Sequence, residues 1–226
     1  MKIAVILSGC GVFDGSEIHE ATCTLLNIDK QGAEYQCFAP DVLQAKVVNH
    51  FNRQTEDDEQ RNILVEAARI ARGKIKDLKE FDTIDFDAVI FPGGSGAITN
   101  LCDFGMVGNR CTVNPDVARV VIDCFESRMP IGAICVAPVL IAQMLGENGI
   151  TITIGNDAKI AAAIEQTGAH HQNCPADKAV TDEENLIVTT PAYMLARSIK
   201  EVDAGISQLV SEIVRLGREH GADQNT

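Results

Sequence analysis

The stretch KIAVILS, residues 2–8, is a continuous apolar run rich in β-branched residues, with no polar residue between Ile3 and Leu7. A strand with one wet face would alternate apolar and polar residues, so this run predicts a strand buried on both faces. Similar runs recur at 88–91, 131–134, 150–154 and 186–190, and a further strand is expected at 34–38. Strands of this kind are typical of parallel sheets.

Helical patterns lie between these runs. The first follows Ser16, which we expect to be its N-cap, and it keeps apolar residues on one face until Gly32 ends it. Further helices are expected at 61–72, 116–127, 138–145, 157–166 and 197–216. Strands alternating with helices predict an α/β fold with a doubly wound, mostly parallel sheet. Because the 226 residues contain no linker and no internal repeat, we expect one domain over residues 1–226.

Two stretches interrupt this alternation. Residues 41–87 separate two strands and contain the acidic run Glu56-Asp57-Asp58-Glu59, which we interpret as the solvated start of a helix. Residues 95–115 are dotted with glycine, and we expect a long loop there. Long loops in compact domains are often lids or binding loops.

Charge and cysteine spacing exclude several classes of function. The chain carries 19 basic and 32 acidic residues, a formal net charge of −13, which repels nucleic acid and anionic lipid. No apolar stretch approaches the roughly 18 residues of a membrane helix, so we expect no membrane partner. Residues 1–7 lack the features of a signal peptide, and we expect a cytoplasmic chain. None of the eight cysteines forms a C-x-x-C pair, so we expect reduced thiols and no metal site.

Ligands of open α/β sheets bind at the carboxyl ends of the strands, so the residues after each strand are the candidates for chemistry. Cys135 follows the run 131–134 and precedes a helix, with the small residues Ala133 and Ala137 on either side, as in a nucleophile elbow. The positive end of that helix is expected to lower the pKa of the thiol. The alternative is that Cys135 is one more buried cysteine.

The glycine pair Gly93-Gly94 follows another strand, 88–91. Glycines at such a position let the backbone approach closely and can aim N–H groups at one point. Together with the amide of Val136, they could form an oxyanion hole beside Cys135.

These residues resemble a known family. Phe91-Pro92-Gly93-Gly94 and residues 133–138 (AICVAP) look like the class I glutamine amidotransferase-like superfamily, in its DJ-one/PfpI branch of deglycases, glyoxalases and intracellular proteases. Residues 6–12 (ILSGCGV) and 14–21 (DGSEIHEA) are similar to the ElbB-type glyoxalase family, also called enhancing lycopene biosynthesis protein 2 or isoprenoid biosynthesis protein with amidotransferase-like domain. Residues 37–41, 154–157 and 188–195 fit it too, so the resemblance covers nearly the whole chain.

The resemblance implies a flavodoxin-like fold, a reactive Cys135, no cofactor and a homodimer. It also implies a carboxylate from the first helix, which matches Glu20, with Glu17 one turn earlier as the alternative. An acid in the first turn, such as Glu17, also favours the helix dipole, which is a purely structural role. Further candidates for lining the pocket are Cys10, Asp14 and Tyr193. For Cys10, a small core residue and a redox partner of Cys135 are the other interpretations.

One feature departs from the related enzymes, which place a histidine shortly after the strand that follows the elbow helix. Here residues 154–157 read IGND, and His170 and His171 come later, in an expected loop. A Cys–His–Glu amidotransferase triad is therefore not expected.

The leading hypothesis is a cofactor-independent glyoxalase-type enzyme. Its partner would be a small 2-oxoaldehyde, glyoxal or methylglyoxal, which forms a hemithioacetal on Cys135 while Glu20 moves the proton. The alternatives are a non-enzymatic or redox-sensing partner protein linked to isoprenoid biosynthesis, and an amidotransferase subunit.

Overall fold

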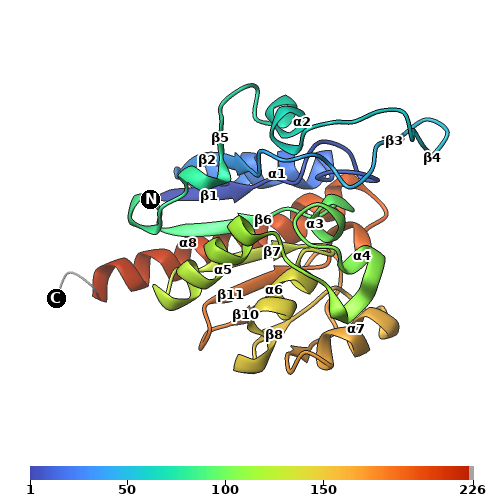
Figure 1. Cartoon of the computed structure of the whole chain (residues 1–226). Coiled ribbons are helices and arrows are strands. Elements are labelled where there is room, and N and C mark those ends of the chain that lie inside the picture. The colour runs from blue at the N-terminus through green and yellow to red at the C-terminus, as the bar shows by residue number, and fades with distance from the viewer. Residues whose placement is uncertain (224–226) are drawn as a thin grey trace.

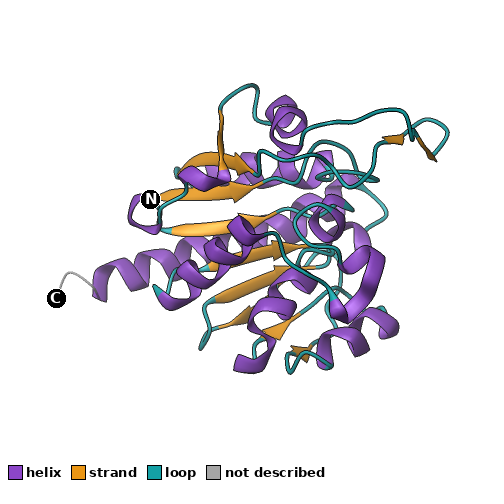
Figure 2. Cartoon of the chain, viewed as in Figure 1, coloured by secondary structure: helices purple, strands orange, loops and turns teal. Residues whose placement is uncertain are grey.

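The computed structural model describes the backbone of residues 1–223 and the side chains of residues 1–219. Its centre is a seven-stranded sheet in the order β10-β11-β7-β6-β1-β2-β5 (Figures 1 and 2). Only β10 runs antiparallel to its neighbour; the other pairs are parallel. The strands of this sheet are β1 Lys2–Ile6, β2 Glu34–Ala39, β5 Ile75–Asp77, β6 Ala88–Phe91, β7 Ile131–Ile134, β10 Val180–Asp182 and β11 Ile187–Thr190. The predicted α/β, flavodoxin-like fold with a mostly parallel sheet is confirmed.

Helices cover both faces of the sheet (Figure 1). On one face α1 packs against α8, which also contacts β6, β7 and β11. On the other face α5 packs against α6, which contacts β7. The helices are α1 Ile18–Lys30, α2 Ile63–Ile70, α3 Gly96–Thr99, α4 Phe104–Val107, α5 Pro115–Glu126, α6 Pro138–Leu145, α7 Ala158–Glu165 and α8 Ile199–Asp223.

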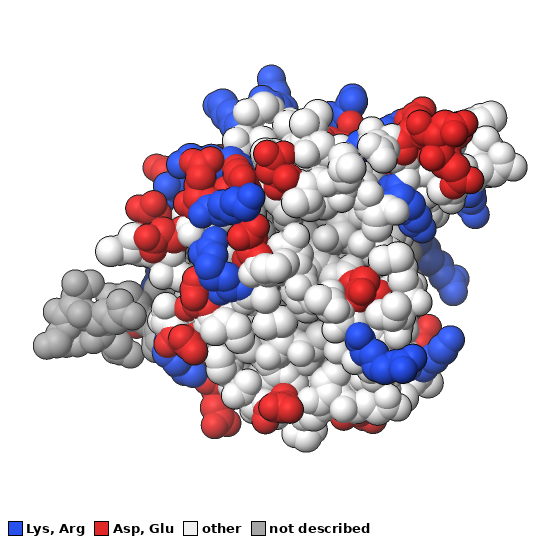
Figure 3. All heavy atoms as spheres, in the orientation of Figure 1, with Lys and Arg blue, Asp and Glu red and all other residues white. Residues whose placement is uncertain are grey.

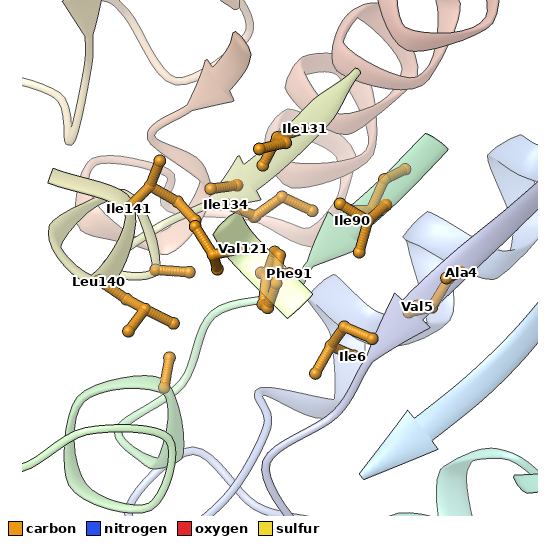
Figure 4. Packing of buried hydrophobic residues seen from close by; sticks show 14 of the residues in the cluster. Ala4, Val5, Ile6, Ile90, Phe91, Val121, Ile131, Ile134, Leu140 and Ile141 are labelled. Atoms are coloured by element: carbon orange, nitrogen blue, oxygen red, sulfur yellow. The ribbon is translucent and has the colours of Figure 1, made fainter. Parts of the chain in front are cut away.

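The core lies between these layers and is built on the three central strands. Every residue of β6 and β7 is buried, as are Ile3 to Ile6 of β1. Figure 4 shows side chains of these strands, among them Ile6, Ile90 and Ile131, together with Leu140 and Ile141 of α6. Burial on both faces explains why these strands carry unbroken apolar runs, since no position faces water.

The prediction for residues 150–154 is wrong in part. Residues Thr151–Ile152 form β8, which pairs in parallel with β9, His170–His171, in a separate two-stranded sheet. The place beside β11 in the main sheet is taken by β10. Residues of this segment instead bond to side chains of β10 and β11: the amide of Thr151 donates to Asp182 and that of Thr153 donates to Thr189. Apart from the partly exposed Thr151 the segment is buried, but it does not extend the main sheet.

The start of the first helix also differs from the prediction. Glu17, not Ser16, is the N-cap, because its Oε2 accepts the N–H of Glu20 at 2.7 Å. The Ser16 hydroxyl accepts the N–H of Ser8 at 2.8 Å and so fastens the chain to the end of β1. Ile18 and Leu26 are exposed, so the apolar stripe is narrower than the sequence pattern indicates.

Both irregular stretches contain more structure than expected. Residues 41–87 hold a projecting hairpin of β3, Val48–Asn49, and β4, Gln54–Thr55, as well as the edge strand β5 (Figure 1). The acidic run at 56–59 follows the hairpin as a loop and ends before α2 begins at Ile63, so it is not the start of a helix. Residues 95–115 contain the one-turn helices α3 and α4 and a 3-10 turn at Gly108–Arg110.

The helix predicted at 138–145 is α6 with the same bounds, whereas the other remaining predicted helices have shifted ends. The pattern at 61–72 shortens to α2, and the last helix runs from Ile199 to Asp223 rather than over 197–216.

Acidic side chains gather on the projecting hairpin region, at the upper right of Figure 3. Among the described residues, no helix has the length and apolar character to cross a membrane.

Candidate functional site

Cys135 sits at the turn between β7 and α6 with a left-handed backbone, φ 63°. Its N–H donates to the carbonyl of Thr190 at 2.9 Å, which ties the turn to the neighbouring strand β11. A non-glycine residue at positive φ is strained, and such strain persists where the surroundings enforce it, often at functional sites. Ala133 and Ala137 are fully buried at the two sides of the turn. The elbow geometry expected from the sequence is present.

Gly93 brings the elbow and the first helix together. A Cβ at this position would clash with the Cβ of Cys135, with Oε2 of Glu20 and with the carbonyl of Ile134. The Gly93 carbonyl also accepts the N–H of Glu17 at 2.9 Å, which fixes the start of α1 to the end of β6. Glycine is thus required sterically, because the Cys135 and Glu20 side chains meet across its bare Cα.

Glu20 lies in the first turn of α1 and is completely buried. Its Oε1 accepts the N–H of Tyr193 at 3.2 Å. Its Oε2 lies on the side of Gly93 and Cys135, whose amide and thiol act on the carboxyl, but it makes no hydrogen bond of ordinary geometry with any described residue. Burial, followed by the nearby charge of Glu17, raises the pKa of Glu20 to about 8. The carboxyl group is therefore mostly protonated at neutral pH, and a proton donor or acceptor is held beside the cysteine.

The electrostatics of Cys135 are opposite to the expectation. Burial, followed by the charge that Glu20 carries when it is ionised, raises the pKa of the Cys135 thiol well above its ordinary value. The amides of Gly94 and Val136 act in the other direction and lower it, as predicted for the start of the elbow helix. They do not outweigh burial. The expected low pKa is therefore wrong, and the resting sulfur is a thiol.

Two of the three predicted oxyanion donors face the cysteine. The N–H groups of Gly94 and Val136 interact with the sulfur of Cys135, whereas that of Gly93 interacts with the Glu20 carboxyl. Gly94 has φ 99°, and a Cβ there would clash with the backbone of residues 15–17. Backbone donors from the ends of β6 and β7 therefore converge on one small region.

Tyr193 and Glu17 lie beside this pair. Besides binding Glu20 through its amide, Tyr193 contacts His19, whose Nδ1 lies 2.8 Å from the tyrosine hydroxyl. Glu17 caps α1, and its Oε1 lies 3.9 Å from the same His19 nitrogen. The geometry thus favours a structural role for Glu17, as the cap of α1, and Glu20 is the carboxyl that faces Cys135.

His19 is the site residue that sequence reasoning missed. Its side chain is half exposed and its ring lies 5.9 Å from that of Tyr193, centroid to centroid. The available signal was its position directly before Glu20. The residue that pairs with it, however, is 174 positions away in the chain. No local pattern reports a pairing over that distance.

Cys10 and Asp14 are not brought to Cys135. Asp14 is buried and accepts the N–H of Val48 at 2.8 Å, so it anchors the β3–β4 hairpin to the loop after β1. The charged groups around Cys10 are Glu66, Arg69 and Asp14, and burial together with Glu66 raises the pKa of its thiol. Both residues therefore belong to the packing of the hairpin and α2.

The later histidines lie elsewhere too. His170 and His171 form β9 rather than a loop, and His171 Nε2 accepts the N–H of Ile154 at 3.3 Å. Burial lowers the pKa of His171, as expected for an imidazole that serves as an acceptor. In the part of the chain that the structure describes, no group of three His, Cys, Asp or Glu side chains is arranged to hold a metal ion.

Comparisons with known proteins give long, high-coverage matches. No model of a known protein family matches the chain. The human mitochondrial glutamine amidotransferase-like class 1 domain-containing protein 3 is 42% identical over 224 residues, covering 95% of this chain and 83% of the human one. The rat mitochondrial ES1 protein homologue is 40% identical, covering 95% and 84%. Among solved structures, an isoprenoid biosynthesis protein with an amidotransferase-like domain from Ehrlichia chaffeensis is 35% identical. It covers 96% of this chain and 99% of its own, with a TM-score of 0.90.

Proposed function

The chain belongs to the family of ES1 proteins and ElbB-type isoprenoid biosynthesis proteins with an amidotransferase-like domain, within the DJ-one/PfpI superfamily, and on this premise we propose that it is a glyoxalase-type enzyme. The superfamily includes enzymes. The proposed reaction converts glyoxal or methylglyoxal, with water, to the hydroxy acid without a cofactor.

The observation that carries the proposal is the meeting of Cys135 and Glu20 across Gly93. Glu20 is fully buried, yet its Oε2, which lies on the cysteine side, makes no hydrogen bond of ordinary geometry with any described residue. A buried polar atom without a partner costs free energy, so such an atom in a native structure calls for an explanation. A substrate proton or hydroxyl next to Cys135 would supply the missing partner.

The residues fit the steps of the reaction. The Cys135 sulfur adds to the aldehyde carbon, and the thiol proton ends on the former carbonyl oxygen, which gives a hemithioacetal. Glu20 as a carboxylate removes the hydrogen from that carbon and returns a proton to the adjacent carbon, while the hydroxyl proton moves to the adjacent oxygen. The product is a thioester, and water then breaks its C–S bond to release the hydroxy acid and the thiol.

The backbone donors support the same sequence of steps. Negative charge develops on the oxygen of the attacked carbon, next to the sulfur on which the amides of Gly94 and Val136 already act. Fixed N–H groups aimed at a developing oxyanion stabilise it without reorganisation. The same groups would stabilise the enediolate that forms when Glu20 removes the proton.

The test is steady-state turnover of glyoxal by the purified chain, without glutathione or added metal. We expect turnover in the wild type, none in Cys135→Ala, and a loss of about a hundred- to ten-thousand-fold in Glu20→Gln. Glu20→Gln is expected to keep alkylation of Cys135 by iodoacetamide, which separates loss of the proton carrier from loss of the site.

A matched control is Cys10→Ala. It removes a thiol that lies among Glu66, Arg69 and Asp14 rather than at the elbow, and we expect it to keep full turnover. Absence of turnover in the wild type would overturn the proposal in favour of a non-enzymatic or redox-sensing protein. Unchanged turnover in both Cys135→Ala and Glu20→Gln would place the activity elsewhere.

A further inference from the structure

The segment between α3 and α5 is closed at its base by a short backbone ladder. Cys102 faces Val113 in an antiparallel bridge. On either side of this bridge, the N–H of Asp103 donates to Thr112 at 3.2 Å, and the N–H of Asn114 donates to Leu101 at 2.9 Å. The chain between Asp103 and Thr112 therefore forms a loop that this ladder closes. Cys102 lies in the first arm of the ladder, and a second cysteine lies directly beside the other arm.

The second cysteine is Cys111, which directly precedes Thr112. Because Cys102 lies opposite Val113 in the antiparallel bridge, residue 111 lies diagonally from it on the same face of the ladder, which brings the two thiols together. Burial, followed by the charge of Asp103, raises the pKa of the Cys111 thiol. Cys102 is buried and its sulfur also lies 3.6 Å from the carbonyl of Ala97. Cys111 is partly exposed, and both thiols are free in this structure.

We propose that Cys102 and Cys111 are a redox-active pair that forms a reversible intramolecular disulfide with a peroxide as oxidant. Cys111 is the attacking residue, because it is the thiol that solvent reaches. Its sulfur attacks one oxygen of hydrogen peroxide, the O–O bond breaks, and hydroxide leaves with the thiol proton as water, which gives a sulfenic acid. The Cys102 sulfur attacks the sulfenic sulfur, and the S–O bond breaks as a second water leaves with the Cys102 proton. A small dithiol reverses the reaction by exchange.

The loop between the two cysteines can adjust to the new bond. It consists of α4, which has no buried residue, and the turn at Gly108–Arg110. Met106 and Val107 on this loop are exposed. Phe104 packs against the core and Asn109 donates to the carbonyl of Ala163, so the adjustment to disulfide geometry falls on the exposed stretch 105–107 between them.

The disulfide would fasten the segment that follows the Gly93-Gly94 loop. Asn100, just before the ladder, donates to the carbonyls of Ser8 and Asp14, and the N–H of Ser95 donates to Val12. Oxidation therefore stabilises a stretch that is attached to the end of β1 and to the backbone near Cys135. The inference is independent of the proposed glyoxalase activity, because it concerns neither Cys135 nor Glu20.

Trypsin offers a direct test, because Arg110 lies between the two cysteines. Complete cleavage places Cys102 in the peptide 80–110 and Cys111 in the peptide 111–119, each with a single cysteine. After exposure of the full folded chain to a molar excess of hydrogen peroxide and alkylation of the remaining thiols, we expect the two peptides to be joined, with two hydrogen atoms lost. Reduction before digestion is expected to separate them.

Two variants make the test specific. Cys111→Ser is expected to abolish the joined peptide and leave Cys102 reduced, whereas Cys10→Ser, which removes another partly exposed thiol, is expected to keep it. Oxidation is also expected to raise the Tm by on the order of 5 °C in the wild type and not in Cys111→Ser. The inference would be overturned if the two peptides were recovered unjoined, whether Cys111 is then alkylated, held in a mixed disulfide or oxidised to sulfinic acid. So would a disulfide from Cys111 to any other cysteine.

Discussion

At the scale of single residues, the carboxyl group of Glu20 determines how the site responds to pH. With a pKa raised to about 8, roughly one tenth of the molecules carry an ionised Glu20 at pH 7. If the carboxylate is the base of the proposed reaction, kcat/KM for glyoxal rises with pH and levels off above about 8. A pH profile of kcat/KM measures this, since it reports the groups of the free enzyme. A profile that is flat from pH 6 to 9 would contradict the assignment.

Gly93 also matters at the scale of single residues, because the site has no room for a side chain at this position. Gly93→Ala is expected to reduce turnover at least tenfold and to lower the free energy of unfolding by about 1–3 kcal/mol, since the new Cβ clashes with Cys135 and Glu20. Urea unfolding and glyoxal kinetics measure both effects. Gly32→Ala is the matched control. That site has φ 67° and open space, so the variant should lose about 1 kcal/mol from backbone strain and keep its turnover. Equal turnover in the two variants would argue against the steric role.

At the scale of elements, the start of α1 couples helix capping to the chemistry. Glu17 accepts the N–H of Glu20 and its charge raises the pKa of Glu20. Glu17→Gln keeps an acceptor oxygen for the cap but removes the charge, so we expect the pKa of Glu20 to fall and the rise in the pH profile to move to lower pH. Glu17→Ala loses the cap as well, and is expected to cost about 0.5–2 kcal/mol of stability. Comparing the pH profiles and urea midpoints of the two variants measures the two effects separately. A pH profile of Glu17→Gln that coincides with the wild type would show that the charge is screened.

At the scale of the whole molecule, stability is expected to depend on pH through the same buried carboxyl. A carboxyl whose pKa is raised on folding binds more protons in the native state between its two pKa values. The stability it contributes is therefore complete below about pH 4.5 and is lost as the pH rises through about 8. Glutamine at this position does not titrate, so the wild type should lose stability relative to Glu20→Gln between pH 5 and pH 8.5, by up to roughly 4 kcal/mol. Urea unfolding of both proteins at the two pH values checks this. A difference that stays constant would contradict it.

The layered architecture also predicts a gradient of local stability. The central strands β1, β6 and β7 are buried and paired on both sides, whereas the β3–β4 hairpin projects and carries Phe51 almost fully exposed. Native-state hydrogen exchange is expected to be slowest in the three central strands and fastest in the hairpin. Edge strand β5 should fall between them. Fast exchange in β6 or β7 would show that the sheet opens from its centre.

Most of the fold could be predicted from the sequence because its signals are local. Strands β1, β6 and β7 are unbroken apolar runs, and burial on both faces leaves no other pattern for them. Strands β5 and β10 escaped prediction because each has three residues and includes polar or charged side chains. Their places are set by the neighbouring strands β2 and β11, which a local window does not contain.

For the candidate site, the sequence by itself determined the elbow at Cys135 and the glycine at position 93. Both follow from residue types next to a strand end, which are local facts. Only the tertiary structure decided that Glu20 rather than Glu17 faces the cysteine and that His19 pairs with Tyr193. It also decided that burial, which raises the pKa of Cys135, outweighs the lowering expected from the elbow helix. These depend on segments that are far apart in the chain and on how completely they exclude water from one another. Dehydration of a charge is a property of the packed molecule, and no stretch of sequence carries it alone.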